Sequence, residues 1–218
     1  MQRVESLALL NFNTRVHFGH GSRAELPAEM QAQGIERPLF ITDKGVIAAG
    51  VYAMATDALG AMAQAAVFDA TPPNPTEDAT EAGLALFRAQ GCDGIVGIGG
   101  GATLDLAKAI AVLCGDPAPL WEYCNRHAHP RPILNPPPVI LLPTTAGSGS
   151  EVGRSAVVIF RNGIKAGVGC PTLVKAAICD PELTLGLLPY MTAASGMDAL
   201  SHCVETYCSP AINPRPTR

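Results

Sequence analysis

Short hydrophobic runs alternate with alanine-rich stretches in the first half of the chain. Residues 38–42 (PLFIT), 66–69 (AVFD) and 94–98 (GIVGI) show almost no polar alternation, which is typical of strands buried on both faces. Helical patterns separate and follow these runs, at 45–64, 76–90 and 102–114. Apolar strands separated by helices predict an α/β fold, with a doubly wound parallel sheet connected by right-handed crossovers.

Two helix starts in this half have side chains suited to capping. Ser22 and Glu25 have the spacing of a capping box, so we predict a helix from Ser22 to Gly34. Thr76 is expected to cap the helix that runs to about Gln90.

The second half begins with an extended connector, because residues 130–138 contain five prolines. Beyond it, strands are predicted at 139–142, 156–160, 164–168 and 176–179. A helical pattern then returns over residues 192–207.

Composition narrows the function classes. Hydrophobic residues make up 48% of the chain and the net charge is -4, which argues against a nucleic-acid partner. The seven cysteines form no CxxC pair, so we interpret them as reduced thiols of a cytosolic protein. The N-terminal apolar stretch is too short for a membrane span and lacks a cleavage site. A cytoplasmic protein without a membrane partner is therefore predicted.

A run of glycines stands where the third predicted strand gives way to a helix. Gly99, Gly100 and Gly101 would let the backbone approach a pyrophosphate, whose charge the following helix N-terminus favours. With Gly97 and Ala102 they also fit the dinucleotide-binding spacing. The loop does not follow the first predicted strand, and no acid ends a strand about twenty residues on. A tight turn required only by packing is therefore the alternative.

Asp43 ends the predicted strand 38–42 and supplies an acid upstream of the glycines. A carboxylate there can accept hydrogen bonds from the adenosine ribose and repel a 2′-phosphate, which favours NAD over NADP. The alternative role for an isolated aspartate here is a helix cap.

Six motifs follow one another over nearly the whole chain. They are TDKG at 42–45, PNPT at 73–76, GGGATLDLAK at 99–108, PTTAGSGSE at 143–151, DPEL at 180–183 and GMDALSHCVETY at 196–207. In this order they resemble the iron-containing (group III) alcohol dehydrogenase family. Ordered motifs are far more specific than any single one of them.

The resemblance implies an NAD site. Asp43 and Asn74 would face the adenosine half, and the glycine run would hold the pyrophosphate. The other cofactor-binding residues that it implies are Asp105, Thr144, Thr145, Ser148 and Lys165. Hydroxyls can donate to phosphate and ribose oxygens, and a lysine adds positive charge. Taken alone, the segment 143–150 would be interpreted as a polar turn.

Asp198 and His202 are four residues apart on a predicted helix, so both project from one face. A carboxylate and an imidazole suit Fe(II), or Zn(II) as the alternative. By itself such a pair is more often an ordinary helix-surface contact, but the resemblance makes both residues metal ligands and catalytic residues. The family's two further histidine ligands come from a helical domain beyond this position.

The resemblance also divides the chain. Residues 1–187 would form an α/β NAD-binding domain, and residues 188–218 the first helix of an all-helical metal-binding domain. Because the sequence stops at Arg218, we expect a chain cut short before its metal site is complete. The remaining histidines match no family ligand: His17, His20, His127 and His129.

The implied function is an NAD-dependent alcohol dehydrogenase that moves a hydride between a small alcohol or aldehyde and the nicotinamide, with metal assistance. One alternative is a catalytically incomplete NAD-binding fragment. Another is a related metal enzyme of the glycerol dehydrogenase or dehydroquinate synthase kind, which the motifs at 143–147 and 196–200 disfavour. Whether the protein forms a homo-oligomer is left open.

Overall fold

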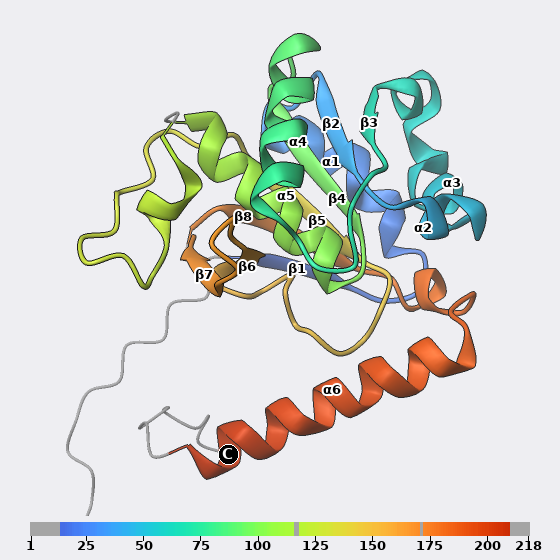
Figure 1. Cartoon of the computed structure of the whole chain (residues 1–218). Coiled ribbons are helices and arrows are strands. Elements are labelled where there is room, and N and C mark those ends of the chain that lie inside the picture. The colour runs from blue at the N-terminus through green and yellow to red at the C-terminus, as the bar shows by residue number, and fades with distance from the viewer. Residues whose placement is uncertain (1–13, 116–117, 171, 210–218) are drawn as a thin grey trace, which may run out of the picture.

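A parallel sheet forms the centre of the molecule (Figure 1). The computed structural model describes residues 14–115, 118–170 and 172–209. The sheet has six strands in the order β1-β8-β5-β4-β2-β3, and every neighbouring pair is parallel. The strands are β1 (Arg15–Phe18), β2 (Pro38–Ile41), β3 (Ala66–Phe68), β4 (Gly94–Gly99), β5 (Val139–Pro143) and β8 (Val174–Cys179). The predicted α/β class with a parallel sheet is confirmed.

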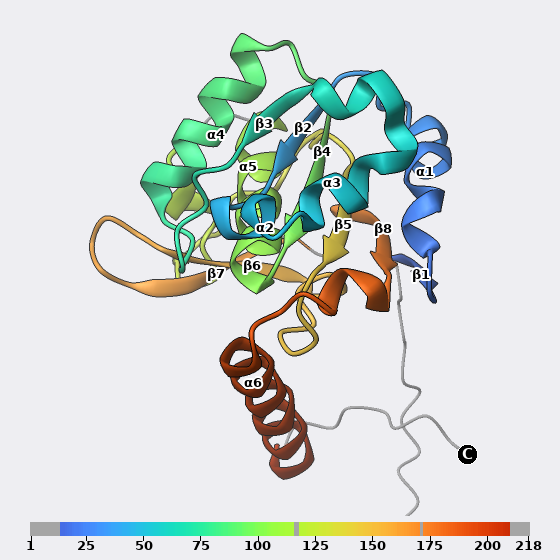
Figure 2. The same ribbon diagram turned by 90° about the vertical axis from the view of Figure 1, so that its right-hand side faces the viewer.

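Helices cover both faces of this sheet and bury a separate apolar core on each (Figure 2). Alternate residues of a strand serve opposite cores, so Leu39 and Ile41 face one core and Phe40 faces the other. In one core, α1 (Leu26–Ala32) and α3 (Val51–Thr56) pack against one face of the sheet. In the other core, α4 (Glu77–Ala89) and α5 (Gly101–Gly115) pack against the opposite face.

Shorter elements complete the connections. The stretch 45–64 is not one helix. The helical conformation is interrupted at Gly50, whose φ of 74° is left-handed. It forms α2 (Lys44–Ala48), α3 and the 3-10 helix η2 (Asp57–Gln64). Three further 3-10 helices are η1 (Ser22–Glu25), η3 (Leu120–Tyr123) and η4 (Pro181–Thr184).

The two predicted caps have different outcomes. Thr76 caps α4 as expected, because its hydroxyl accepts a hydrogen bond of 3.1 Å from the Ala79 amide. The capping box at Ser22 is wrong. Ser22 lies inside η1, which begins after a left-handed Gly21 and has no side-chain cap, and α1 starts only at Leu26.

A two-stranded antiparallel hairpin lies outside the main sheet. It consists of β6 (Ser155–Ile159) and β7 (Lys165–Gly169), and its buried side chains, such as Val158 and Val168, join the core around α5. Both strands lie within a residue of the predicted ranges, but their segregation from the parallel sheet was not predicted.

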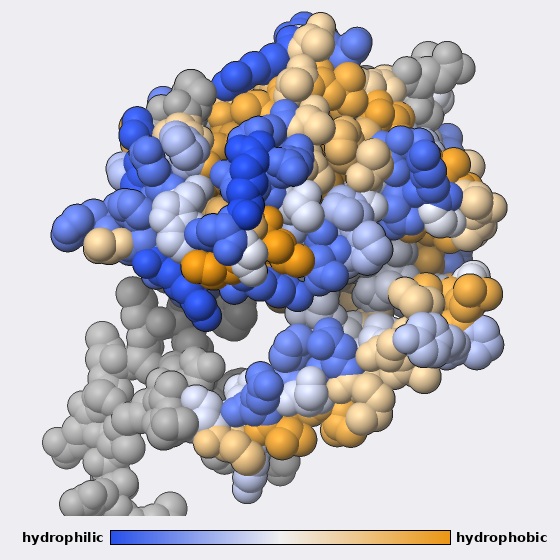
Figure 3. Space-filling model, viewed as in Figure 1, coloured by the Kyte–Doolittle hydropathy of each residue, from blue (hydrophilic) through white to orange (hydrophobic). Residues whose placement is uncertain are grey.

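The long helix α6 (Pro189–Cys208) projects from the body of the molecule (Figures 1 and 2). None of its residues is buried. Hydrophobic residues gather along one side of it, the lower side in Figure 3. No helix in the described ranges is long and apolar enough to cross a bilayer.

Candidate functional site

The order in which strands join the sheet reverses between the parallel neighbours β2 and β4, since β3 lies beyond β2 and β5 lies beyond β4. The chain leaves β2 towards α2 and α3 on one face, and leaves β4 towards α5 on the other. Connections that diverge in this way leave a crevice outside the carboxyl ends of the two strands, the usual ligand site of open α/β sheets. Asp43 and the glycine run 99–101 stand at the two sides of this point.

The glycines of β4 and its loop permit close packing. A side chain at Gly97 would begin 3.0 Å from the Cβ of Ala107, so α5 packs closely on the strand. At Gly101 a Cβ would lie only 2.8 Å from the Ser148 side chain. At Gly100, in contrast, the nearest atoms belong to Thr145 at 3.5 Å, an ordinary contact distance. Packing therefore explains the glycines at 97 and 101 but leaves Gly100 without a packing reason.

Asp43 has the helix-cap role that the sequence left open, and it also bonds α5. Its Oδ1 accepts a hydrogen bond of 2.9 Å from the Val46 amide and caps α2. Its Oδ2 accepts one of 3.5 Å from the Thr103 hydroxyl, in the first turn of α5. The carboxylate thus spans the crevice between the strand end and the glycine-led helix. Thr103 was not among the predicted site residues.

The segment 144–150, here called the hydroxyl loop, lies against the glycine run. The Thr144 amide donates to the Gly99 carbonyl at 2.9 Å. Thr145 and Ser148 are partly exposed, and their side chains adjoin Gly100 and Gly101 respectively. Two of the three predicted hydroxyls, those of Thr145 and Ser148, are therefore brought to the glycine run.

Asn74 and Lys165 meet although they are 91 residues apart, with Lys165 Nζ donating to Asn74 Oδ1 at 3.0 Å. Both are exposed. Arg161, which was not among the predicted site residues, holds the hairpin against the start of α4. Its guanidinium donates to the carboxylates of Asp78 and Glu81. Its backbone amide donates to Glu77. Lys165 and Asn74 thus form one exposed polar pair between the hairpin and the segment before α4.

Asp105 is bonded to the end of the hydroxyl loop and to the hairpin. Its Oδ1 accepts a hydrogen bond of 2.5 Å from the Ser150 hydroxyl, and its Oδ2 accepts one of 3.0 Å from the Val157 amide. Lys108, which is wholly buried, forms an ion pair of 2.9 Å with the same carboxylate.

Asp198 and His202 lie on α6, each about half exposed, with Oδ2 and Nδ1 3.9 Å apart. Ser195, one turn earlier, has its backbone against Gly147 of the hydroxyl loop, where any side chain would clash with it. Across the described ranges, no three His, Cys, Asp or Glu side chains come together as a metal site would need. The predicted pair is present, but it has no third ligand among these residues.

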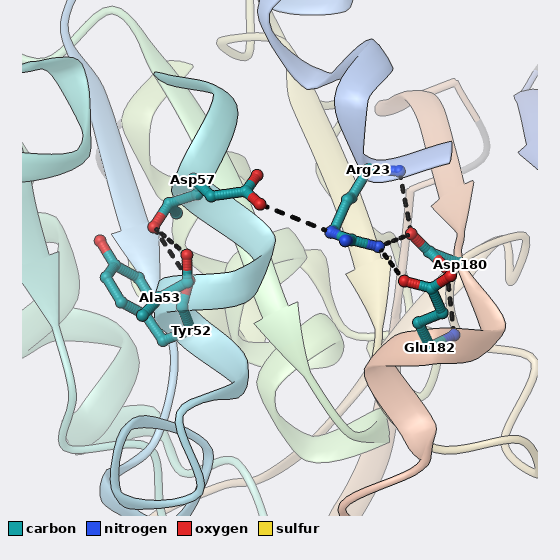
Figure 4. A network of polar contacts seen from close by, with 7 residues as sticks. Arg23, Tyr52, Ala53, Asp57, Asp180 and Glu182 are labelled. Carbon is teal, nitrogen blue, oxygen red and sulfur yellow. Dashed lines mark hydrogen bonds and ion pairs between the residues drawn. The ribbon is translucent and has the colours of Figure 1, made fainter. Parts of the chain in front are cut away.

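The DPEL motif anchors the connection from β8 to α6 (Figure 4). Asp180 is buried and caps η4 by accepting from the Glu182 amide at 3.0 Å. The Arg23 guanidinium donates to Asp180 at 2.8 Å and to Glu182 at 2.6 Å. Burial raises the pKa of Asp180, but the bonds from Arg23 and from backbone amides outweigh it, and the net pKa is lowered.

Two cysteines of the second half have protonated thiols: Cys170 is buried and Cys179 is partly buried. Burial raises the pKa of Cys170 and of Cys179 to about 11 in each case. Both thiols are therefore protonated at neutral pH and are poor nucleophiles.

Known proteins resemble the chain in sequence. Residues 13–181 match the family described as iron-containing alcohol dehydrogenase. The 4-hydroxybutyrate dehydrogenase of Cupriavidus necator is 46% identical over 210 residues, which cover 95% of this chain and 55% of that protein. The lactaldehyde reductase of Escherichia coli K12 is 32% identical over 201 residues, which cover 89% and 52%. The chain thus spans about half the length of these curated relatives.

Solved structures agree with the sequence comparison. A sulfoacetaldehyde reductase from Bifidobacterium kashiwanohense, in complex with NAD+, superposes with a TM-score of 0.84 at 32% identity, covering 96% of this chain and 55% of that one. A 1,3-propanediol oxidoreductase gives the same TM-score and identity, covering 95% and 55%. The family match extends over most of the chain, and its fold is the one described above. The chain belongs to the iron-containing alcohol dehydrogenase family.

Proposed function

We propose that this chain is the NAD(H)-binding part of a dehydrogenase that exchanges a hydride between a small alcohol or aldehyde and the nicotinamide. The observation that carries the proposal is that Asp43, at the end of β2, meets the glycine-led helix α5 at the switch point of the sheet, where its Oδ2 lies 3.5 Å from the Thr103 hydroxyl. That position is where α/β sheets bind dinucleotides. The NAD+ complex of the related sulfoacetaldehyde reductase supports the choice of cofactor.

The residues of the crevice suit the parts of this cofactor. The free N–H groups at the start of α5 would bind the pyrophosphate, and Gly100 leaves room for its approach. Asp43 would accept from the ribose hydroxyls, and Asn74 with Lys165 would supply an amide and a positive charge at the rim. Thr145 and Ser148 would donate to phosphate or ribose oxygens. NAD supplies the hydride acceptor, and the protein supplies position and charge.

The described residues do not make a complete metal site. Asp198 and His202 offer two ligands, while a catalytic zinc normally has three protein ligands. We assign residues 188–218 to the start of a separate metal-binding domain, and residues 1–187 to the nucleotide domain. On this assignment Asp198 and His202 contribute to catalysis in the whole protein.

Titration with NADH, followed by nicotinamide fluorescence, tests the proposal directly. We expect saturable binding that NAD+ displaces, and weaker binding of NADPH because Asp43 would repel its 2′-phosphate. No saturable binding of either cofactor would overturn the proposal.

The incomplete metal pair also favours a second function, a nucleotide-binding fragment without catalysis of its own. An assay of NAD+ reduction with propanol or 1,2-propanediol and added Zn(II) or Fe(II) distinguishes the two. Cofactor binding without turnover supports the fragment, whereas turnover supports an enzyme.

A further inference from the structure

Lys108 is a lysine without solvent exposure, three residues after Asp105 on α5. Its ammonium has three N–H donors. The acceptors are the Ser150 carbonyl at 2.9 Å, the Ser155 carbonyl at 2.7 Å and Asp105 Oδ1 at 2.9 Å. All three donors are therefore matched by protein acceptors, and no donor is left over for a phosphate.

Both carboxylate oxygens of Asp105 are likewise bonded to protein groups. Its two oxygens accept from Lys108, from the Ser150 hydroxyl and from the Val157 amide. Asp105 and Lys108 together thus bond both the side chain and the backbone carbonyl of Ser150. They also bond β6, the first strand of the hairpin. A buried charge pair of this kind persists only where the surrounding polar groups satisfy it.

The partners of the pair form the far end of the hydroxyl loop and the start of β6. Ser150 ends the loop, and Ser155 begins β6. At its other end the loop is tied to β4 by the bond from the Thr144 amide to the Gly99 carbonyl. The pair lies on α5 one to two turns after the glycine run, so one rigid helix carries both the glycine run and the anchor of the loop.

We propose that Asp105 and Lys108 are positioning residues that hold the hydroxyl loop, and with it Thr145 and Ser148, at a fixed distance from the glycine run. They act on the cofactor only through this loop. The role differs from the direct cofactor contact expected for Asp105, because its carboxylate is mostly buried and is already bonded to Lys108, Ser150 and Val157. The effect on NADH rests on the proposed function; the effect on the loop does not.

Two variants test the proposal by different degrees of disruption. Lys108→Met removes all three donors while keeping the length of the side chain, and Ser150→Ala removes only the hydroxyl that bonds Asp105. We expect weaker NADH binding, by about tenfold and about threefold respectively, since bonds to charged groups are the stronger class. We also expect faster amide hydrogen exchange over residues 144–150, with unchanged protection of β4 and β5.

Lys175→Met is the matched control, because Lys175 is exposed and its bond among the described residues is to the nearby Thr172 carbonyl. It should alter neither readout. Ser150→Thr, which restores a hydroxyl, should recover slow exchange and tight binding relative to Ser150→Ala. If Lys108→Met does not fold, the Ser150 variants decide.

The outcomes distinguish a positioning role of the two residues from a general contribution to folding stability. Folded variants with lower melting temperature but unchanged loop exchange and unchanged NADH affinity would overturn the proposal. If the unmodified chain does not bind NADH, the proposed function fails, and the exchange of residues 144–150 still tests whether the pair holds the loop.

Discussion

The two oxygens of Asp43 have different partners. Oδ1 caps α2, and Oδ2 faces Thr103 across the crevice. A helix cap needs only an oxygen acceptor, whereas rejection of a 2′-phosphate needs the negative charge. The two roles are therefore separable by substitution.

Asp43→Ser should keep the cap and remove the charge. We expect the NADH-to-NADPH affinity ratio to fall by at least about tenfold, which corresponds to about 1.4 kcal/mol. Fluorescence titration of both cofactors measures the ratio. Asp43→Ala is the control that also loses the cap, at a further cost of about 1 kcal/mol in the free energy of unfolding. An unchanged ratio in Asp43→Ser would remove the residue from cofactor selection.

Gly100 is the glycine of the loop that packing does not explain. A Cβ there would meet Thr145 at an ordinary 3.5 Å. Gly100→Ala should therefore change the free energy of unfolding by no more than about 1 kcal/mol, yet weaken NADH binding at least about tenfold because the methyl group enters the path of the pyrophosphate. Gly100→Val should abolish binding.

Gly101→Ala is the comparison for this prediction, since its methyl group would also push against Ser148 at 2.8 Å. That variant should lose stability and affinity together. Normal NADH binding by Gly100→Val would place the phosphate site elsewhere.

At the scale of elements, the Arg23–Asp180 contact ties η1 to the segment that leads into α6. The lowered pKa of Asp180 makes this tie dependent on pH. A group whose pKa is lower in the folded state stabilises the fold above its unfolded pKa, which is about 3.9 for aspartate. That contribution is lost as the pH falls through the lower, folded-state pKa.

Asp180→Asn should lower the free energy of unfolding by about 2 kcal/mol at pH 7, the range expected for bonds to a buried charge. The difference from the unmodified protein should shrink below about pH 4. Urea unfolding at pH 7 and below about pH 4 measures this difference in the free energy of unfolding. Asp57→Asn is the control, because Asp57 is 58% exposed and 3.9 Å from Arg23, and it should change stability little. A constant difference at all pH values would contradict the assignment.

Elements whose patterns are local were predictable, and those that depend on distant partners were not. The apolar runs of β2, β4 and β5 are buried on both sides, so their sequences carry the signal alone. In β1, polar Arg15 and His17 alternate with exposed Val16 and Phe18, and the segment is a strand because it pairs with β8 at the sheet edge. Its partner is about 160 residues away, which no local pattern reveals.

At the scale of the whole molecule, α6 has two distinct sides. Met197, Leu200, Val204 and Tyr207 recur at helical spacing, and each is more than half exposed. Asp198 and His202 lie on a different side, which they share with Ser195 at the hydroxyl loop. Asp198 and His202 are thus on the side of α6 that meets the hydroxyl loop, and the apolar stripe is on the opposite side.

We predict that the 218-residue chain binds NADH but binds Zn(II) or Fe(II) weakly, and oxidises simple alcohols little or not at all. Two ligands orient a metal poorly, and each missing ligand lowers affinity. Calorimetric titration with Zn(II) should give weak binding that His202→Ala removes. Tight metal binding or robust turnover would show that other groups complete the site.

The sequence by itself determined the strands with uninterrupted apolar runs, the Thr76 cap, and the residue types at the crevice. Each depends on neighbours a few positions away, through side-chain period, local hydrogen bonds or the freedom of glycine. Only the tertiary structure decided which groups Asp105 bonds and that Lys108 is buried. A lysine is normally expected at the surface, and its burial depends on acceptors at Ser150 and Ser155, more than 40 residues away. Those acceptors exist only once the hydroxyl loop and the hairpin have packed against α5.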